Sequence, residues 1–201
     1  NFLVNPKSII MWTGIKTQCK KVEIELLRKE YLQVSYIQIM GNIKKGDENG
    51  VVDLFNMVPK VIEASSIMPD KKYNEIMKFT NYYTSSAKLI NNVENCYGEY
   101  DLEKFFSTDY EQNPKITINF YPSSQLDEVV IHKIFVYNRL DANQNRLVPL
   151  SIKLYNKDNY IVRSALKKSF KEPLIVSVPP PPVPDEFAAN TTYYDLKIGS
   201  N

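Results

Sequence analysis

The chain has 201 residues, of which 43 % are hydrophobic and 24 % are charged, a composition typical of a globular domain and not of a disordered chain. The balance of 25 basic against 23 acidic residues gives a net charge of only +2, so the sequence lacks the strong positive charge of a nucleic-acid-binding protein. No apolar run approaches the roughly 20 residues of a membrane-spanning helix, so we expect no membrane span.

Short runs that alternate apolar and polar residues recur along the chain and predict β-strands. The predicted strands are 21–27, 31–40, 59–64, 115–121, 129–137, 150–155, 160–162 and 174–178. A series of about eight short strands with turn residues between them is typical of an all-β protein. We therefore predict a jelly-roll-like antiparallel β-sandwich over residues 20–178, preceded by an N-terminal lead-in over residues 1–19.

Helical spacing of apolar residues is scarce. It occurs over residues 71–80, where Asp70 is a candidate N-cap, and over residues 102–106, where Asp101 is a candidate cap. The sequence therefore predicts one or two short helices beside the sheets.

One segment between predicted strands, 41–50, has the two-glycine spacing of a phosphate-binding loop. A phosphate-binding loop continues with Lys and Ser or Thr, whereas Asp47 and Glu48 follow here and would repel a phosphate. We interpret 41–50 as a surface turn.

The sequence offers few residues for catalysis or metal binding. The single histidine, His132, lies in a strongly apolar predicted strand, where we expect it to face outward or to form a hydrogen bond at a sheet edge. His132, Cys19 and Cys96 do not have the spacing of a zinc site, and no nucleophile motif accompanies the histidine. We therefore predict a chain that is not an enzyme, has no cofactor and no metal, and keeps both cysteines as free thiols.

The C-terminal segment, 179–201, has a different composition. It begins with four consecutive prolines, which lack backbone donors and favour an extended polyproline II arm. The residues after the prolines include four large apolar or aromatic side chains, Phe187, Tyr193, Tyr194 and Leu196. We expect these side chains to form an interaction tail that packs on a neighbouring chain or on a distant face of the domain; the alternative is a linker with a loose tail.

The segment 134–147 resembles the central motif of galactose-binding-like β-sandwiches, and more narrowly the fucolectin and discoidin-like (coagulation factor type C) group. Members of that group have an apolar strand, then Asn-Arg-x-Asp, then a second Arg seven residues after the first. The matching residues in this chain are Asn138, Arg139, Asp141 and Arg146. The resemblance extends over residues 20–178, and its specific part is 138–147.

In fucose-binding members of that group the two arginines bind sugar, so the resemblance implies Arg139 and Arg146 as candidate ligand-binding residues. A vicinal cysteine pair and a histidine complete the sugar site in those members, whereas Ala142 and Asn143 replace the cysteines here and the histidine is absent. The alternative is a structural loop that Asn138 and Asp141 help to hold in place by hydrogen bonds. Both arginines would then be mostly buried and would form charge-assisted hydrogen bonds.

Two functions from different classes follow from the sequence. The first is a non-catalytic structural module, a minor capsid or other virion protein of a large DNA virus that is assembled in the host cytoplasm and contacts neighbouring subunits. Lost cysteines and a chain rich in Lys, Asn, Ile and Tyr, whose codons are AT-rich, favour this interpretation. The alternative is an extracellular or cell-surface lectin or adhesin that binds a glycan near Arg139 and Arg146.

Overall fold

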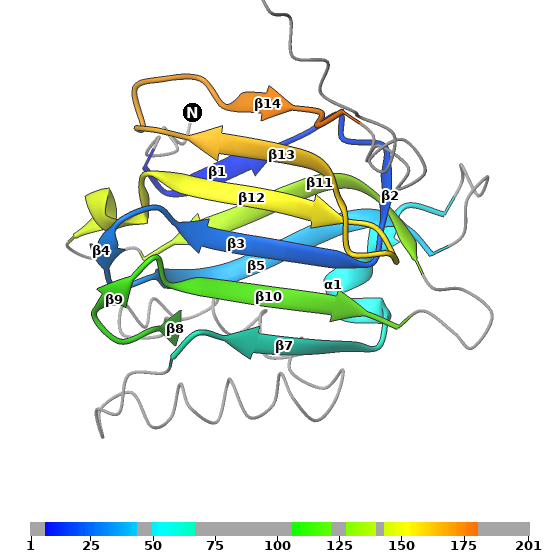
Figure 1. Ribbon diagram of the computed structural model, residues 1–201, viewed down its shortest axis with the longest axis horizontal. Coiled ribbons are helices and arrows are strands. Elements are labelled where there is room, and N and C mark those ends of the chain that lie inside the picture. Colours follow the sequence, from blue (N-terminus) through cyan, green and yellow to red (C-terminus); the bar gives the residue numbers. More distant parts are fainter. Residues whose placement is uncertain (1–6, 44–49, 67–105, 122–127, 140–142, 181–201) are drawn as a thin grey trace, which may run out of the picture.

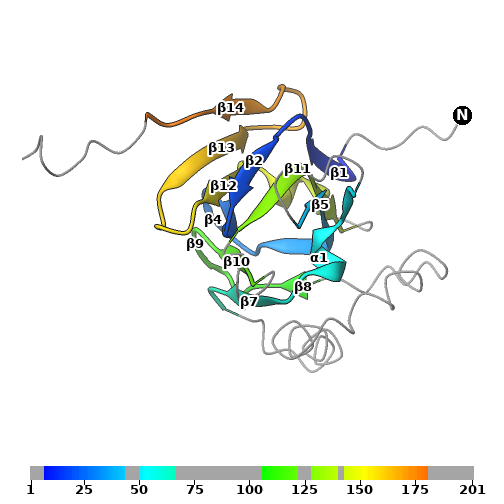
Figure 2. The ribbon, with the colours of Figure 1, turned by 90° about the vertical axis from the view of Figure 1, so that its right-hand side faces the viewer.

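The computed structural model describes residues 7–43, 50–66, 106–121, 128–139 and 143–180. Strands dominate these residues, and the helical elements among them are a four-residue helix α1 (Leu54–Met57) and a 3-10 helix η3 (Gln144–Leu147). Two six-stranded antiparallel sheets form separate layers, one in front of the other in Figure 1 and side by side in Figure 2. The structure confirms the predicted all-β antiparallel sandwich.

The first sheet, sheet A, is built around β11. Its strands are β1 (Ile9–Trp12), β2 (Thr17–Cys19), β5 (Gln33–Asn42), β6 (Val52–Asp53), β8 (Phe106–Ser107) and β11 (Val129–Asn138). Strand β11 pairs with β5 on one side and with both β1 and β2 on the other. The predicted lead-in over residues 1–19 therefore contributes two strands to the sandwich.

The second sheet, sheet B, has β3 near its centre. In spatial order its strands are β14 (Ile175–Ser177), β13 (Ile161–Lys167), β12 (Leu150–Tyr155), β3 (Lys21–Leu26), β10 (Lys115–Phe120) and β7 (Lys60–Ala64). A small ribbon of β4 (Lys29–Glu30) and β9 (Glu111–Gln112) lies at one end of the sandwich, at the left of Figure 1.

The core lies between the two sheets and follows from the alternation of the strands. In β3, Val22, Ile24 and Leu26 face inward and are completely buried, and in β11 the same holds for Ile134 and Val136. Burying one such aliphatic side chain contributes about 1.5–3 kcal/mol relative to leaving it exposed. The period-2 pattern that predicted these strands is thus the pattern of the core.

Several predicted elements match closely. The strands expected at 21–27, 115–121 and 150–155 are β3, β10 and β12, and the strand expected at 160–162 continues to Lys167 as β13. The turn between β12 and β13 is closed by two backbone bonds, Asn156 N to Tyr160 O at 3.0 Å and Asn159 N to Asn156 O at 3.0 Å.

The predicted surface turn over 41–50 is wrong for its first two residues. Gly41 and Asn42 belong to β5, where they pair with Ile131 and Val130 of β11. A Cβ atom at Gly41 would collide with the Val130 carbonyl oxygen and lie 2.7 Å from Leu54 Cδ1. Glycine is therefore required here by the close approach of two strands and not by a turn.

Some predictions fall on residues that the structure does not describe. The expected helix 71–80, residues 102–105 of the second expected helix, Cys96 and the tail side chains Phe187, Tyr193, Tyr194 and Leu196 lie outside the described residues. Phe106, the last residue of that second helix, lies instead in β8, where it pairs with Val34 of β5.

Candidate functional site

Asn138 is the last residue of β11 and joins three segments of the chain. Its amide Nδ2 donates to the carbonyl oxygens of Lys7 at 2.9 Å and Gln144 at 2.7 Å, and its Oδ1 accepts from the backbone N–H of Arg139 at 2.9 Å. The side chain is buried, so these bonds are shielded from water. Asn138 therefore fixes the motif loop against the N-terminal segment and against η3.

Arg139 is buried beside the start of β5. Only 8 % of the residue is exposed, and its Nη1 donates to Gln33 Oε1 of β5 at 2.6 Å. Gln33 Nε2 in turn donates to Ser107 Oγ of β8 at 3.3 Å. A buried guanidinium that holds the start of β5 is a structural anchor of sheet A and leaves little surface for a ligand.

Arg146 has a different environment, although it belongs to the same motif. Its side chain belongs to η3 and is 33 % exposed, so Arg146 is less buried than Arg139. Arg146 Nε lies 3.6 Å from Glu30 Oε1, and its guanidinium carbon lies 5.5 Å from the centre of the Tyr31 ring. Asp141 lies outside the described residues, so its expected bonds to an arginine or to the loop remain a prediction.

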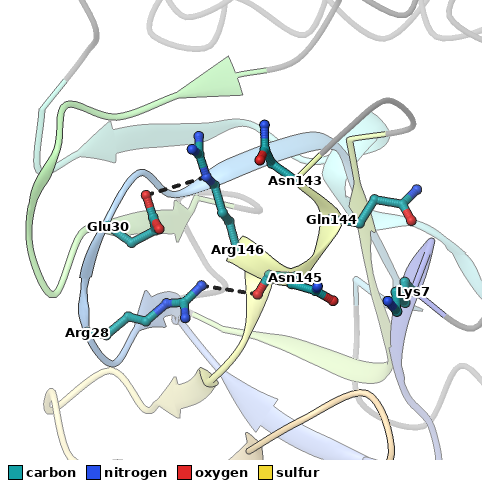
Figure 3. A pocket seen from close by; sticks show the side chains of 7 residues that line it. All are labelled: Lys7, Arg28, Glu30, Asn143, Gln144, Asn145 and Arg146. Atoms are coloured by element: carbon teal, nitrogen blue, oxygen red, sulfur yellow. Dashed lines mark hydrogen bonds and ion pairs between the residues drawn. The ribbon is translucent and has the colours of Figure 1, made fainter.

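An open pocket of about 520 Å³ lies where η3 meets the end of β3 and the strand β4 (Figure 3). We call it the η3 pocket; it is lined by Lys7, Arg28, Glu30, Asn143, Gln144, Asn145 and Arg146. Arg28 Nη2 donates to the backbone oxygen of Asn145 at 3.1 Å, which connects the turn after β3 to η3. Asn143 starts η3 with a left-handed backbone, at a φ of 68°, and its carbonyl accepts from Arg146 N at 2.9 Å.

The lining of the η3 pocket is polar and mostly cationic among its charged groups. Three cations, one carboxylate and three amides line it, which is a set suited to an acidic or hydroxyl-rich ligand. Elsewhere in the described part of the chain, no group of three or more His, Cys, Asp or Glu side chains is placed to hold a metal ion.

Sequence reasoning missed Arg28. It lies 117 residues from Asn145, and nothing in the local sequence connects the two. The signal that could have singled it out is rarity, because Arg28 is one of only four arginines in the chain.

The single histidine and the described cysteine have the roles that the sequence predicts. His132 is partly buried, and its Nε2 contacts Asn42 Oδ1 of the neighbouring strand. Cys19 is a free thiol in the core, and burial, together with the negative charge of Glu128, raises its pKa well above the usual range. A thiol held in its neutral form is inert, so Cys19 serves packing.

The outer face of sheet B carries a charge network that we call the ionic face, formed by Glu23, Glu25, Lys115, Lys153 and Tyr155. Lys153 Nζ lies 3.2 Å from Glu23 Oε1 and 2.7 Å from Glu25 Oε2, and Lys115 Nζ lies 3.4 Å from Glu23 Oε2. The Tyr155 hydroxyl donates to Glu23 at 3.0 Å.

The ionic face changes the titration of its members. Burial alone would raise the pKa of the Glu23 carboxyl, but hydrogen bonds from Lys153 and Tyr155 and the charges of Lys153 and Lys115 outweigh it and lower that pKa. Burial and the negative charge of Glu23 raise the pKa of Tyr155 to about 12. The charges of this face therefore satisfy one another within the domain.

The outer face of sheet A has the opposite character. We call it the aromatic face and define it by Ile9, Met11, Tyr36, Phe135 and Tyr137. Met11 pairs with Phe135 and Ile9 with Tyr137 across β1 and β11, and Tyr137 pairs with Tyr36 of β5. The Tyr36 and Tyr137 rings lie 5.5 Å apart, and the Phe135 and Tyr137 rings 6.4 Å apart. Met11 at the sheet edge is 59 % exposed.

In the part of the chain that the structure describes, no helix is long and apolar enough to span a membrane. No protein-family model matches the chain, and neither a curated protein nor a solved structure matches it. The β-sandwich is therefore a finding of the structure, whereas the narrower galactose-binding-like assignment rests on the motif residues Asn138, Arg139, Asp141 and Arg146.

Proposed function

We propose that this chain is a non-catalytic structural module that docks on a neighbouring protein subunit in a larger assembly. The observation that carries the proposal is the aromatic face, which places Met11, Phe135 and Tyr137 side by side on the outside of sheet A. Met11 is 59 % exposed and Phe135 and Tyr137 are partly exposed, whereas Tyr36 is buried. Apolar surface left in water is unfavourable by about 25 cal/mol per Å². Contiguous apolar surface on a folded domain is typical of an interaction site.

The chemistry of the aromatic face fits a protein partner. Aromatic residues and Met are enriched at the centre of protein interfaces, and charged residues are depleted there. The face has polar groups at its margin: Tyr137 OH donates to Gln38 Oε1 at 3.4 Å, and Lys133 is exposed. The ionic face of sheet B already pairs its own charges, so it has less to gain from a partner. The expected partner surface is apolar at its centre with an acidic or polar rim.

We further propose that the assembly is a virion and that this chain is a minor capsid or other virion protein assembled in the host cytoplasm. The support is the galactose-binding-like motif at 138–147 without its cysteine pair, in a chain where only four of the 25 basic residues are Arg. Neither feature requires a ligand-binding role. A binding domain that has taken on a structural role is expected to keep its fold and to lose residues of its ligand site.

A photo-crosslinking amino acid at two positions tests the docking. The full chain is produced in its native source with the crosslinker at Met11 on the aromatic face or, as the matched control, at Lys115 on the ionic face. We expect one discrete crosslinked product from position 11 in purified particles, and none from position 115. Equal crosslinking at both positions, or none at position 11 in assembled material, would contradict the proposal.

A second candidate function is carbohydrate binding at the η3 pocket, because Arg146 is partly exposed there and the pocket is open. Arg139 would then support the site from inside the sandwich and not contact the glycan. A glycan array with the wild-type chain and with Arg146→Ala tests this function. Loss of binding at an unchanged melting temperature would favour the lectin over the structural module.

A further inference from the structure

We infer that the η3 pocket binds a sugar acid, with the carboxylate held by Arg28 and Arg146 and the hydroxyl groups held by the asparagines of η3. The inference deepens the second candidate function, on which it rests, by naming the class of saccharide. It follows from the charge balance, the donor count and the amide groups of the pocket.

The charge balance of the η3 pocket favours an anion. Arg28 and Arg146 come from different parts of the chain and lie on either side of Glu30, the one carboxylate of the lining (Figure 3). Arg146 Nε is 3.6 Å from Glu30 Oε1, which is an ion pair but too long for a good hydrogen bond. Arg28 has no ion pair among the residues that the structure describes. The two guanidinium groups therefore exceed the negative charge available to them.

Both guanidinium groups also keep unused donors. A guanidinium has five N–H donors, and Arg28 uses one of them for the Asn145 carbonyl oxygen at 3.1 Å. Its Nε is shielded from solvent and has no hydrogen-bond partner in the described part of the chain. An atom shielded in this way is out of reach of a ligand, so a ligand would bind the terminal Nη1 and Nη2 groups of Arg28. A carboxylate matches the planar fork of a guanidinium in a bidentate way.

The amide side chains favour a saccharide over a simple anion. Asn143 and Asn145 are exposed, and neither side chain forms a hydrogen bond with another described residue. Each amide can donate and accept, which matches the hydroxyl groups of a sugar ring.

A titration with matched small molecules tests the inference on the full chain. The probes are glucuronic acid, its neutral counterpart glucose, acetate as a carboxylate without the sugar, and inorganic phosphate. We expect glucuronic acid to bind at least tenfold more tightly than the other three, measured as Kd by NMR titration. Arg28→Gln and Arg146→Gln should each weaken glucuronic acid binding at least tenfold, whereas Lys29→Gln, which removes a nearby exposed charge outside the lining, should leave it unchanged.

Every other outcome overturns the inference in a distinguishable way. Glucose binding as tightly as glucuronic acid would retain a glycan site and reject the acidic sugar. Phosphate or acetate binding as tightly would reject the saccharide, and no binding of any probe at millimolar concentration would reject the glycan function as well. An equal loss in Lys29→Gln would show general charge attraction. If Arg28→Gln or Arg146→Gln does not fold, as judged by circular dichroism, Arg28→Lys and Arg146→Lys replace them. These variants keep the positive charge but lack the planar guanidinium group that binds a carboxylate in a bidentate way.

Discussion

The two outer faces of the sandwich follow the same alternation but have opposite chemistry. The outward positions of β3 in sheet B are Lys21, Glu23 and Glu25, whereas those of β11 in sheet A include Phe135 and Tyr137. The Glu23 side chain is only 10 % exposed because its neighbours cover and neutralise it, whereas Met11 beside Phe135 is 59 % exposed. The charges of one face are paired within the domain, whereas the other face is covered at Tyr36 by Phe55 and leaves Met11 exposed.

Alternation along a strand therefore identifies the side chains that point away from the core, but not the groups that surround them there. A charged outward residue can be satisfied within its own sheet, as Glu23 is by Lys115, Lys153 and Tyr155. An outward-facing aromatic side chain contributes hydrophobic free energy only when another surface covers it.

Substituting Gly41 with Ala should break sheet A most severely. The new Cβ would collide with the Val130 carbonyl oxygen, so β5 and β11 would have to separate. We expect the free energy of unfolding to fall by about 3 kcal/mol or more, measured by urea denaturation. Gly14→Ala is the matched control, since a Cβ there has open space and meets only a backbone strain at φ 68°, with an expected loss of about 1 kcal/mol. Equal losses in the two variants would show that crowding at Gly41 is relieved easily.

Arg139→Ala should destabilise the sandwich by about 2 kcal/mol, because it removes a charged donor from the buried Gln33 side chain. Arg146→Ala should change the free energy of unfolding by less than about 1 kcal/mol, since its ion pair with Glu30 is long and partly exposed. Thermal unfolding of both variants separates the buried anchor of sheet A from the open pocket. A larger loss in Arg146→Ala than in Arg139→Ala would contradict the roles assigned to the two arginines.

Glu23→Gln should weaken the ionic face by about 1 kcal/mol at pH 7. The pKa of Glu23 is lower in the folded than in the unfolded chain, so its charge stabilises the fold above the unfolded pKa, and this contribution is lost as the pH falls through the folded pKa. We therefore expect the acid side of the stability profile to become flatter in Glu23→Gln. Glu25→Gln, which removes the carboxylate 2.7 Å from Lys153, tests whether any neighbouring carboxylate has the same effect.

Lys60 should give an effect of similar size to that of Glu23 and with the same sign, but at alkaline pH. Its ammonium group lies 4.9 Å from the Phe55 ring centre, and burial lowers its pKa to about 8 in spite of the charge of Asp53. Between that value and the unfolded pKa of about 10.4 the unfolded chain binds more protons, so stability should rise with pH. We expect a rise of about 1 kcal/mol after solvent screening, absent from Lys60→Met. A Lys60→Met profile parallel to that of the wild type would contradict the lowered pKa.

The longer strands of the fold were predictable because each carries enough alternation to mark its own inward side. β3, β10 and β12 have six residues each, and their inward side chains are Val, Ile, Leu or Phe. β1 and β2 have four and three residues, which is too short for a periodic signal. Their strand conformation depends on β11, which lies more than a hundred residues away in the sequence.

The sequence predicted which loop contains the candidate site, but not which distant residues the side chains of that loop contact. The sequence identified Arg139 and Arg146 and could not separate them, because burial depends on Gln33 and Glu30 in other parts of the chain. Gly41 shows the same limit, since its residue type suggested a turn whereas the approach of β11 explains it. The missing information in each case is a long-range contact.

Two short strands cover one edge of β11, and this arrangement makes the N-terminal segment a protective cap. β1 lies along residues 134–137 and β2 along residues 129–131, so a chain cut to residues 20–178 would expose the whole edge of a ten-residue strand. The buried side chains of β11 include Val129, Ile131, Ile134 and Val136, and an open strand edge can pair with other chains. We therefore expect removal of the first 19 residues to favour pairing of β11 with strands of other chains.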